Sequence, residues 1–137
     1  MRRRRKAFTL IEILIVITII ALMASLVAPK LFSKLESSKQ KVAKTQIHLI
    51  ENALDAFRLD VGRYPTTEEG LKVLWENPGN IKGWDGPYLP KPVKEDPWGH
   101  PYVYKCPGKH GKYDLYSLGA DGKPGGKGEN KDITSWE

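Results

Sequence analysis

The residue with the clearest chemical potential is Glu12, the single charged side chain in the apolar run from Phe8 to Ala28. A helix of about 21 residues is long enough to cross the ~30 Å hydrocarbon core of a bilayer. A carboxylate within such a helix is costly unless it has a partner or stays near the membrane interface. Glu12 is therefore a candidate functional residue.

Side chains that commonly perform catalysis do not gather elsewhere. His48, His100 and His110 are too scattered to predict a metal or catalytic cluster, and the sequence has no Ser-His-Asp spacing, Gly-rich phosphate loop or HExxH motif. Cys106 is the only cysteine, so no intrachain disulfide can form, and we expect its thiol to serve buried packing. We expect no enzymatic activity.

A block of positive charge, Arg2 to Lys6, stands directly before the apolar run. Positive residues that flank an apolar helix are held on the cytoplasmic side, so the C-terminus should lie outside the membrane. These five charges account for most of the net charge of +6 and leave about +1 on the rest of the chain. The basic composition is thus a topology signal and predicts no nucleic-acid binding.

Three interpretations compete for the N-terminus. A secretory signal peptide has a shorter apolar region that ends at a small-residue cleavage site. A plain membrane anchor explains the length and the charge but leaves Glu12 without a role. Third, residues 7–12, with the sequence AFTLIE, resemble the prepilin-peptidase recognition sequence of type IV pilins and type II secretion pseudopilins.

This resemblance implies processing and assembly roles for three residues. In that family the basic leader is removed before the Phe, which implies cleavage between Ala7 and Phe8 and N-methylation of Phe8. Ala7 stands where the family usually carries Gly. The resemblance also implies that Glu12 pairs with the amino group of Phe8 on an adjacent subunit.

The boundaries follow from the pattern of apolar residues. We expect a leader over residues 1–7, a transmembrane and polymerisation helix over 8–28, and a periplasmic domain over 29–137. From residue 30 to 61 the pattern becomes that of an amphipathic helix. Its predicted apolar stripe contains Leu31, Leu35, Val42, Ile47, Ile50, Leu54, Phe57 and Val61. Leu31 to Leu35 lie in a more polar stretch, so for them a surface that faces neighbouring subunits is the alternative to a core. Gly62 predicts the end of one helix that begins at Phe8 and continues through Pro29.

Residues 62–137 predict loops and a small β region. A short helix should follow Thr66 or Thr67, either of which can cap it. The Pro- and Gly-rich stretch up to residue 101 should be an ordered loop pinned by Trp84, Tyr88 and Trp98. Residues 102–105 and 113–118 are rich in aromatic and branched side chains, which predicts a β-hairpin.

Three segments of the region after the long helix narrow the resemblance to one group within this family. Residues 63–71 (RYPTTEEGL), 96–104 (DPWGHPYVY) and 113–126 (YDLYSLGADGKPGG) are similar to the major pseudopilins of type II secretion systems. This implies an α+β, type IV pilin-like fold, with a long N-terminal helix packed on a small C-terminal domain that contains a short helix, a small antiparallel sheet and a calcium loop. It also implies a homopolymer that assembles from the inner membrane into a periplasmic pseudopilus and helps to push folded proteins across the outer membrane. Prepilin peptidase, minor pseudopilins and the inner-membrane secretion platform are the implied partners.

The major pseudopilins carry a structural calcium ion in their C-terminal loop, and this loop has suitable oxygen donors. The candidate ligands are Leu118, through its carbonyl, and Asp121, Glu129, Asn130 and Asp132. Many relatives have an acid where this chain has Gly128, so which side chain joins Asp121 is open. The spacing is not that of an EF-hand. The alternative is a solvated Gly-rich turn without an ion.

Two other functions compete with secretion. A type IV pilin for adhesion, motility or DNA uptake shares the N-terminal motif, but such pilins usually close the C-terminal region with a disulfide, which one cysteine cannot form. A periplasmic binding module or enzyme on a membrane anchor would predict no cleavage after Ala7 and no role for Glu12.

Overall fold

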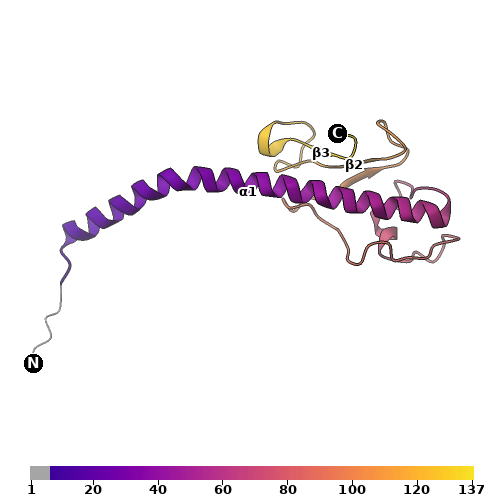
Figure 1. Ribbon diagram of the computed structural model, residues 1–137, viewed down its shortest axis with the longest axis horizontal. Coiled ribbons are helices and arrows are strands. Elements are labelled where there is room, and N and C mark those ends of the chain that lie inside the picture. Colours follow the sequence, from indigo (N-terminus) through magenta and orange to yellow (C-terminus); the bar gives the residue numbers. More distant parts are fainter. Residues whose placement is uncertain (1–6) are drawn as a thin grey trace, which may run out of the picture. The chain divides into compact units, whose positions relative to one another are not determined.

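A long helix and a three-stranded sheet form the main regular structure of the computed structural model, which describes residues 7–137 (Figure 1). Helix α1 comprises Leu10–Val61 and has 52 residues. It ends at Gly62, which has a φ of 91° and donates its N–H to the Arg58 carbonyl at 2.7 Å. A left-handed glycine in this position satisfies a terminal carbonyl without steric cost. The predicted long helix is confirmed, with its start at Leu10 rather than at Phe8.

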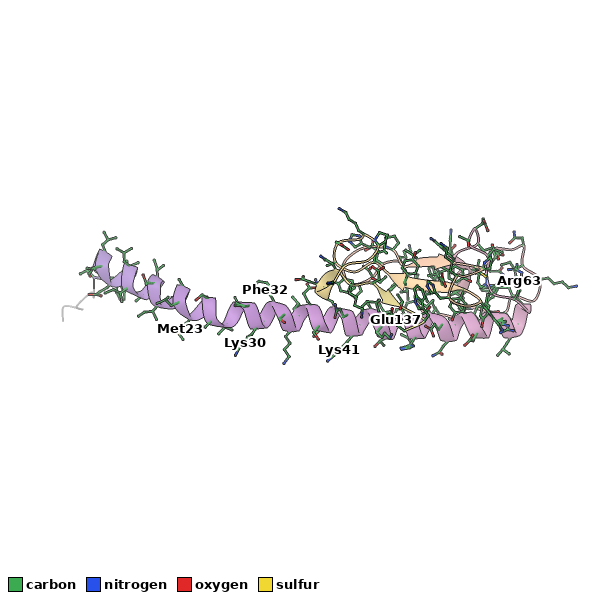
Figure 2. The ribbon with its side chains drawn as sticks, turned by 90° about the horizontal axis from the view of Figure 1, so that it is seen from above. Met23, Lys30, Phe32, Lys41, Arg63 and Glu137 are labelled. Atoms are coloured by element: carbon green, nitrogen blue, oxygen red, sulfur yellow. The ribbon has the colours of Figure 1, made fainter. Side chains whose placement is uncertain are left out.

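The chain divides into two compact units, Met1–Glu36 and Ser37–Glu137. In the first unit, α1 contains a window that is long and apolar enough to span a membrane, with a mean hydropathy of 2.8 and no buried residue in the described structure. Side chains such as Met23 and Phe32 stand out from the helix (Figure 2). Since a bilayer or other subunits must cover this apolar surface, the stretch suits a single membrane span.

The hydrophobic core lies in the second unit, where one face of α1 is buried. Its buried residues are Ala43, Ile47, Ile50, Ala53, Leu54 and Phe57. Their spacing of three and four residues is that of a single helical face. The predicted stripe was wrong at Val42, which is about half exposed, and Ala43 takes the buried position beside it. Leu31 and Leu35 are also exposed, as the alternative of a surface that faces other subunits allows.

The sheet has the antiparallel order β1-β2-β3. Strand β1 comprises Val103–Lys105, β2 comprises Asp114–Ser117 and β3 comprises Ile133–Thr134. Tyr104 pairs with Leu115, and both side chains belong to the buried core. The predicted hairpin is confirmed, whereas the two-residue strand β3 was not predicted.

The connection between α1 and β1 is held by turns and aromatic side chains. The predicted short helix is the 3₁₀ helix η1, Leu71–Leu74. Its N-cap residue is Gly70, so the prediction that Thr66 or Thr67 caps this helix is wrong. The Thr66 hydroxyl instead accepts the Glu69 N–H at 3.1 Å in the preceding turn. The expected role of Trp84 in pinning the loop is confirmed, because its indole N–H donates to the Val73 carbonyl at 2.7 Å.

Tyr88 has the same pinning role. Its ring packs edge-on against the buried ring of Phe57, with centroids 5.7 Å apart, and its hydroxyl donates to Asp60 at 2.8 Å. The long loop is therefore fixed directly to α1. Cys106 is only partly buried, and its thiol lies 3.4 Å from the Lys112 carbonyl.

Candidate assembly and ion-binding residues

Glu12 lies in the first turn of α1 and is exposed. Its backbone N–H donates to the Thr9 hydroxyl at 3.2 Å, so Thr9 caps the helix. The spacing Thr9-x-x-Glu12 is that of a capping box, a signal that the sequence reading did not use. The positive end of the helix favours a carboxylate in this turn.

Ala7 and Phe8 precede α1 and are exposed. Phe8 leaves 73% of its surface uncovered. A peptide bond outside regular structure is accessible to a protease, whereas a bond inside a helix is not. The geometry at residues 7 and 8 is thus compatible with cleavage between them.

The C-terminal loop, defined here as residues 118–132, is built around two carboxylates. Asp121 accepts the Lys123 N–H at 3.1 Å, and Asp132 accepts the Gly125 N–H at 3.1 Å through Oδ2. The second oxygen of Asp132, Oδ1, is buried and has no hydrogen-bond partner in the described structure. A buried carboxylate oxygen without a donor is costly, so Asp132 Oδ1 is suited to accept a further donor or a cation.

Backbone carbonyls crowd the inside of the same loop. A side chain at Gly119 would meet the Lys131 carbonyl at 2.8 Å, and one at Gly126 would meet the Asn130 carbonyl at 2.5 Å. Both glycines have positive φ, 75° and 102°. Only glycine allows this close approach.

The other predicted ligands are placed differently. Leu118 is partly buried, while the Glu129 and Asn130 side chains are exposed. Glu129 turns its carbonyl inward, where it accepts the Ala120 N–H at 3.0 Å. Among residues 7–137 no three His, Cys, Asp or Glu side chains converge as a metal cluster. A calcium ion in this loop would need a mixture of carboxylate and carbonyl oxygens, which is a donor set that calcium accepts.

A buried hydrogen-bond network that the sequence reading missed holds the start of this loop. Asp96 is 5% exposed and accepts the backbone N–H groups of Trp98 and His100 through Oδ1. Its Oδ2 accepts the Ser117 hydroxyl at 2.6 Å, and Ser117 accepts the Gly119 N–H at 3.3 Å. Asp96 before Pro97 is a turn signal in the sequence, but its pairing with Ser117 has no local signature.

A second buried carboxylate orders the loop of the hairpin. Asp114 accepts the backbone N–H groups of Lys109 and His110, each at 3.0 Å. Burial acts to raise the pKa of Asp114, but these N–H groups and the nearby His110 ring outweigh it, and the net pKa is lowered. His110 also stacks on Trp136 with ring centroids 3.9 Å apart, which joins the hairpin loop to the C-terminus.

Comparisons with known proteins give a consistent result. A family model described as "Type II secretion system (T2SS), protein G" matches residues 30–136, and one described as "Prokaryotic N-terminal methylation motif" matches residues 2–28. Type II secretion system core protein G of Pseudomonas aeruginosa is 45% identical over 139 residues, which cover 99% of this chain and 98% of that protein. The protein of the same name from Vibrio cholerae is 42% identical over 98% of this chain and 93% of its own length.

A comparison with solved structures supports the same family. The major pseudopilin from the type 2 secretion system of enterohaemorrhagic Escherichia coli matches with a TM-score of 0.62 and 33% sequence identity, over 79% of this chain and 95% of that chain.

The exposed apolar start of α1, its buried second half and the small antiparallel sheet together define a pilin-like α+β protein. The chain belongs to the type II secretion system protein G family, and it is a major pseudopilin subunit of the type II secretion pseudopilus. Members of this family are structural proteins and not enzymes. Between the two pilus-type functions left open by the N-terminal motif, this assignment selects secretion.

Proposed function

We propose that the chain is made as a precursor, cut between Ala7 and Phe8 by prepilin peptidase, methylated at Phe8, and then polymerised from the inner membrane into the periplasmic pseudopilus. The observation that carries this proposal is the exposed apolar start of α1, in which Glu12 is the single charged residue. This part of the chain lies within the match to the N-terminal methylation motif. Leader residues 1–6 lie outside the described residues.

The mature N-terminus supplies a partner for Glu12. Cleavage before Phe8 creates a free α-amino group, which is positive at neutral pH. A carboxylate inside an apolar bundle needs such a charge, and an amino group on the neighbouring subunit would also fix the register between helices. Repeated head-to-tail contacts of this kind do not close and so generate a filament.

The pseudopilus is proposed to work with further proteins. Minor pseudopilins and the inner-membrane secretion platform are the partners that the family assignment supports. Fibre growth would push folded proteins across the outer membrane, and energy would come from outside this subunit.

Assembly tests the proposal. Glu12→Leu keeps the helix apolar, so the variant should enter the membrane and be cleaved but form no fibres. Thr18→Val is a matched control in the same helix, since the Thr18 hydroxyl donates to the Leu14 carbonyl of its own helix at 2.7 Å. Intact mass should give a chain that begins at Phe8 with one added methyl group. Normal fibres from Glu12→Leu would refute the pairing, and a mass that begins at Met1 would refute the processing.

We further propose that the C-terminal loop holds a structural calcium ion through Asp121, Asp132 and carbonyl oxygens, with Leu118, Glu129 and Asn130 as the other candidates. The unsatisfied Oδ1 of Asp132 supports this proposal. Binding only to the folded state raises stability by mass action. Calcium should therefore raise the melting temperature of the wild-type chain relative to a chelator, and Asp132→Asn should reduce this increment. An increment equal in Asp132→Asn and wild type would remove Asp132 from the ligand set.

A further inference from the structure

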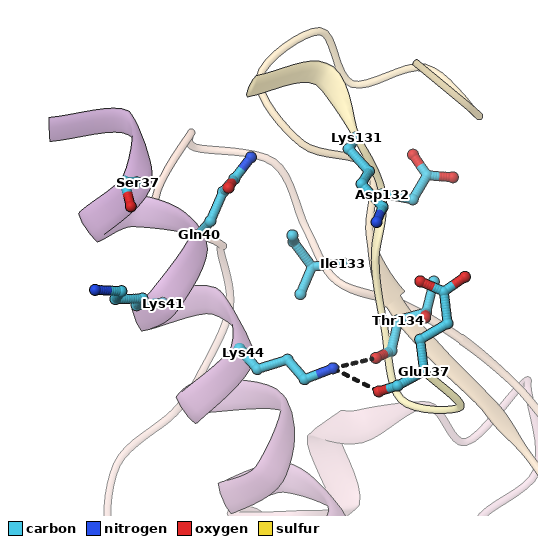
Figure 3. Close-up of a pocket in the computed structure, with 9 residues that line it drawn as sticks. All are labelled: Ser37, Gln40, Lys41, Lys44, Lys131, Asp132, Ile133, Thr134 and Glu137. Carbon is cyan, nitrogen blue, oxygen red and sulfur yellow. Dashed lines mark hydrogen bonds between the residues drawn. The ribbon is translucent and has the colours of Figure 1, made fainter. Parts of the chain in front are cut away.

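Two side chains of α1 reach across to the C-terminal part of the chain. Gln40 donates from Nε2 to the Gly128 carbonyl at 2.6 Å. Lys44, one helical turn further on, donates from Nζ to the Glu137 carbonyl at 2.6 Å and to the Thr134 carbonyl at 3.4 Å (Figure 3). Residues four apart lie on the same helix face, so both contacts come from one side of α1.

The segment that they hold has little apolar burial of its own. Every residue from 123 to 131 is exposed. The buried residues of the hydrophobic core end at Leu115, and Ile133 only packs against their edge. Without apolar contacts, the position of residues 123–131 depends on hydrogen bonds and on the turn glycines.

One contact lies within this segment, at Gly128, and the other lies directly after it, at Thr134 and Glu137. Gln40 holds the peptide at Gly128, which begins the short 3₁₀ helix η2, Gly128–Asn130. This helix orients the Glu129 carbonyl, which accepts the Ala120 N–H and so closes the C-terminal loop across its width. Lys44 holds β3 and Glu137, next to the partly buried Asp132.

We propose that Gln40 and Lys44 are positioning residues through which α1 fixes the C-terminal loop and sets its affinity for calcium. The calcium part rests on the function proposed above. Both donors act on backbone carbonyls, so they constrain the path of the loop without being ligands. The two hydrogen bonds fix the two ends of the segment that carries the candidate ligands Glu129, Asn130 and Asp132. If either bond is lost, the segment must become ordered when the ion binds, and the entropy cost of this ordering lowers the affinity.

The test compares full-length variants in detergent micelles. Gln40→Leu and Lys44→Met remove the donors and keep most of the volume. Lys41→Met is the matched control, because Lys41 lines the same pocket, is exposed, and its ammonium makes no hydrogen bond or ion pair within residues 7–137. Lys44→Arg retains a cationic donor at this position and should restore the wild-type behaviour.

Two measurements separate positioning from general stability. Hydrogen exchange of residues 126–137 should speed up about three- to tenfold in Gln40→Leu and Lys44→Met and stay unchanged in Lys41→Met. A calcium titration followed by melting temperature should show affinity weakened by a similar factor in the same two variants. Lys44→Arg should recover both values.

The outcomes are distinct. Exchange in Gln40→Leu and Lys44→Met equal to that in Lys41→Met overturns the positioning role. Melting temperatures that fall equally with and without calcium show a merely structural role and overturn the link to affinity. If wild type itself gains nothing from calcium, the calcium part of both proposals is overturned, and the exchange rates alone decide whether α1 positions the loop.

Discussion

Replacing Ser117 by alanine tests the buried network at the start of the C-terminal loop. Ser117 is fully buried, and its hydroxyl donates to Asp96 at 2.6 Å. The Ser117→Ala variant leaves the Asp96 carboxylate with only the two backbone donors on its other oxygen. It also removes the acceptor for the Gly119 N–H.

The magnitude follows from the charge of the acceptor. A hydrogen bond to a charged group contributes about 1.5–3 kcal/mol, and the weaker contact at 3.3 Å adds a fraction of that. A loss of about 2 kcal/mol corresponds to a fall of roughly 8–16 °C in melting temperature for a domain of about 100 residues. The C-terminal loop should loosen as well, because Ser117 precedes it directly.

The assay is urea unfolding of the full-length chain in micelles, followed by tryptophan fluorescence. All four tryptophans lie beyond Ser37, so the signal reports the second unit. Ser37→Ala is the control, since Ser37 is exposed on α1 and a surface change of this kind stays within about 0.5 kcal/mol. A loss in Ser117→Ala no larger than in the control would refute the reasoning that the carboxylate depends on this donor.

Two further predictions concern α1 and the turn after it. Phe57→Ala should lower the free energy of unfolding by about 3–5 kcal/mol because Phe57 is fully buried. Leu59→Ala, at an 87% exposed position, should change it by less than about 0.5 kcal/mol. Similar losses for the two variants in urea unfolding would contradict the assigned core face. Glu69 accepts two hydrogen bonds from Arg63, at 2.6 and 3.1 Å, and one from the Thr66 N–H, and these lower its pKa below 4.5. A lowered carboxyl pKa gives stability that is present above pH 4.5 and is lost as the pH falls through the folded-state pKa. Glu69→Gln should thus cost about 1 kcal/mol at pH 7, and its deficit should shrink in acid; a deficit independent of pH would contradict the role of the charge.

The sequence by itself determined the long helix, its end at Gly62 and the hairpin. These features depend on local causes, namely the period of apolar residues, the φ that a glycine can adopt and the β preference of aromatic side chains. The apolar run with Glu12 and the AFTLIE motif also indicated the pilin-like class, because an unpaired acid in an apolar helix requires an explanation that a plain anchor does not give.

Only the tertiary structure decided which helix positions are buried. Val42 and Ala43 are neighbours, and both are apolar, so periodicity alone cannot fix the rotation of the helix to within one residue. Ile47, Ile50, Leu54 and Phe57 of α1 share one buried core with residues of η1 and the sheet. The rotation of the helix that buries them leaves Ala43 buried and Val42 about half exposed.

The pairings that hold the C-terminal loop could not be predicted from the sequence either. Gln40 and Gly128 are 88 residues apart, and Ser117 and Asp96 are 21 apart. The Gly128 carbonyl can accept from any donor that the fold brings near, so this contact leaves no residue pattern. The Ser117–Asp96 pair joins two side chains that come together only when the chain folds, so it leaves no local pattern either. The two-residue strand β3 is too short to carry a periodic signal, and it forms because β2 offers an edge to pair with. The sequence therefore determined the elements with internal repetition, and long-range packing decided where the loop between them is held.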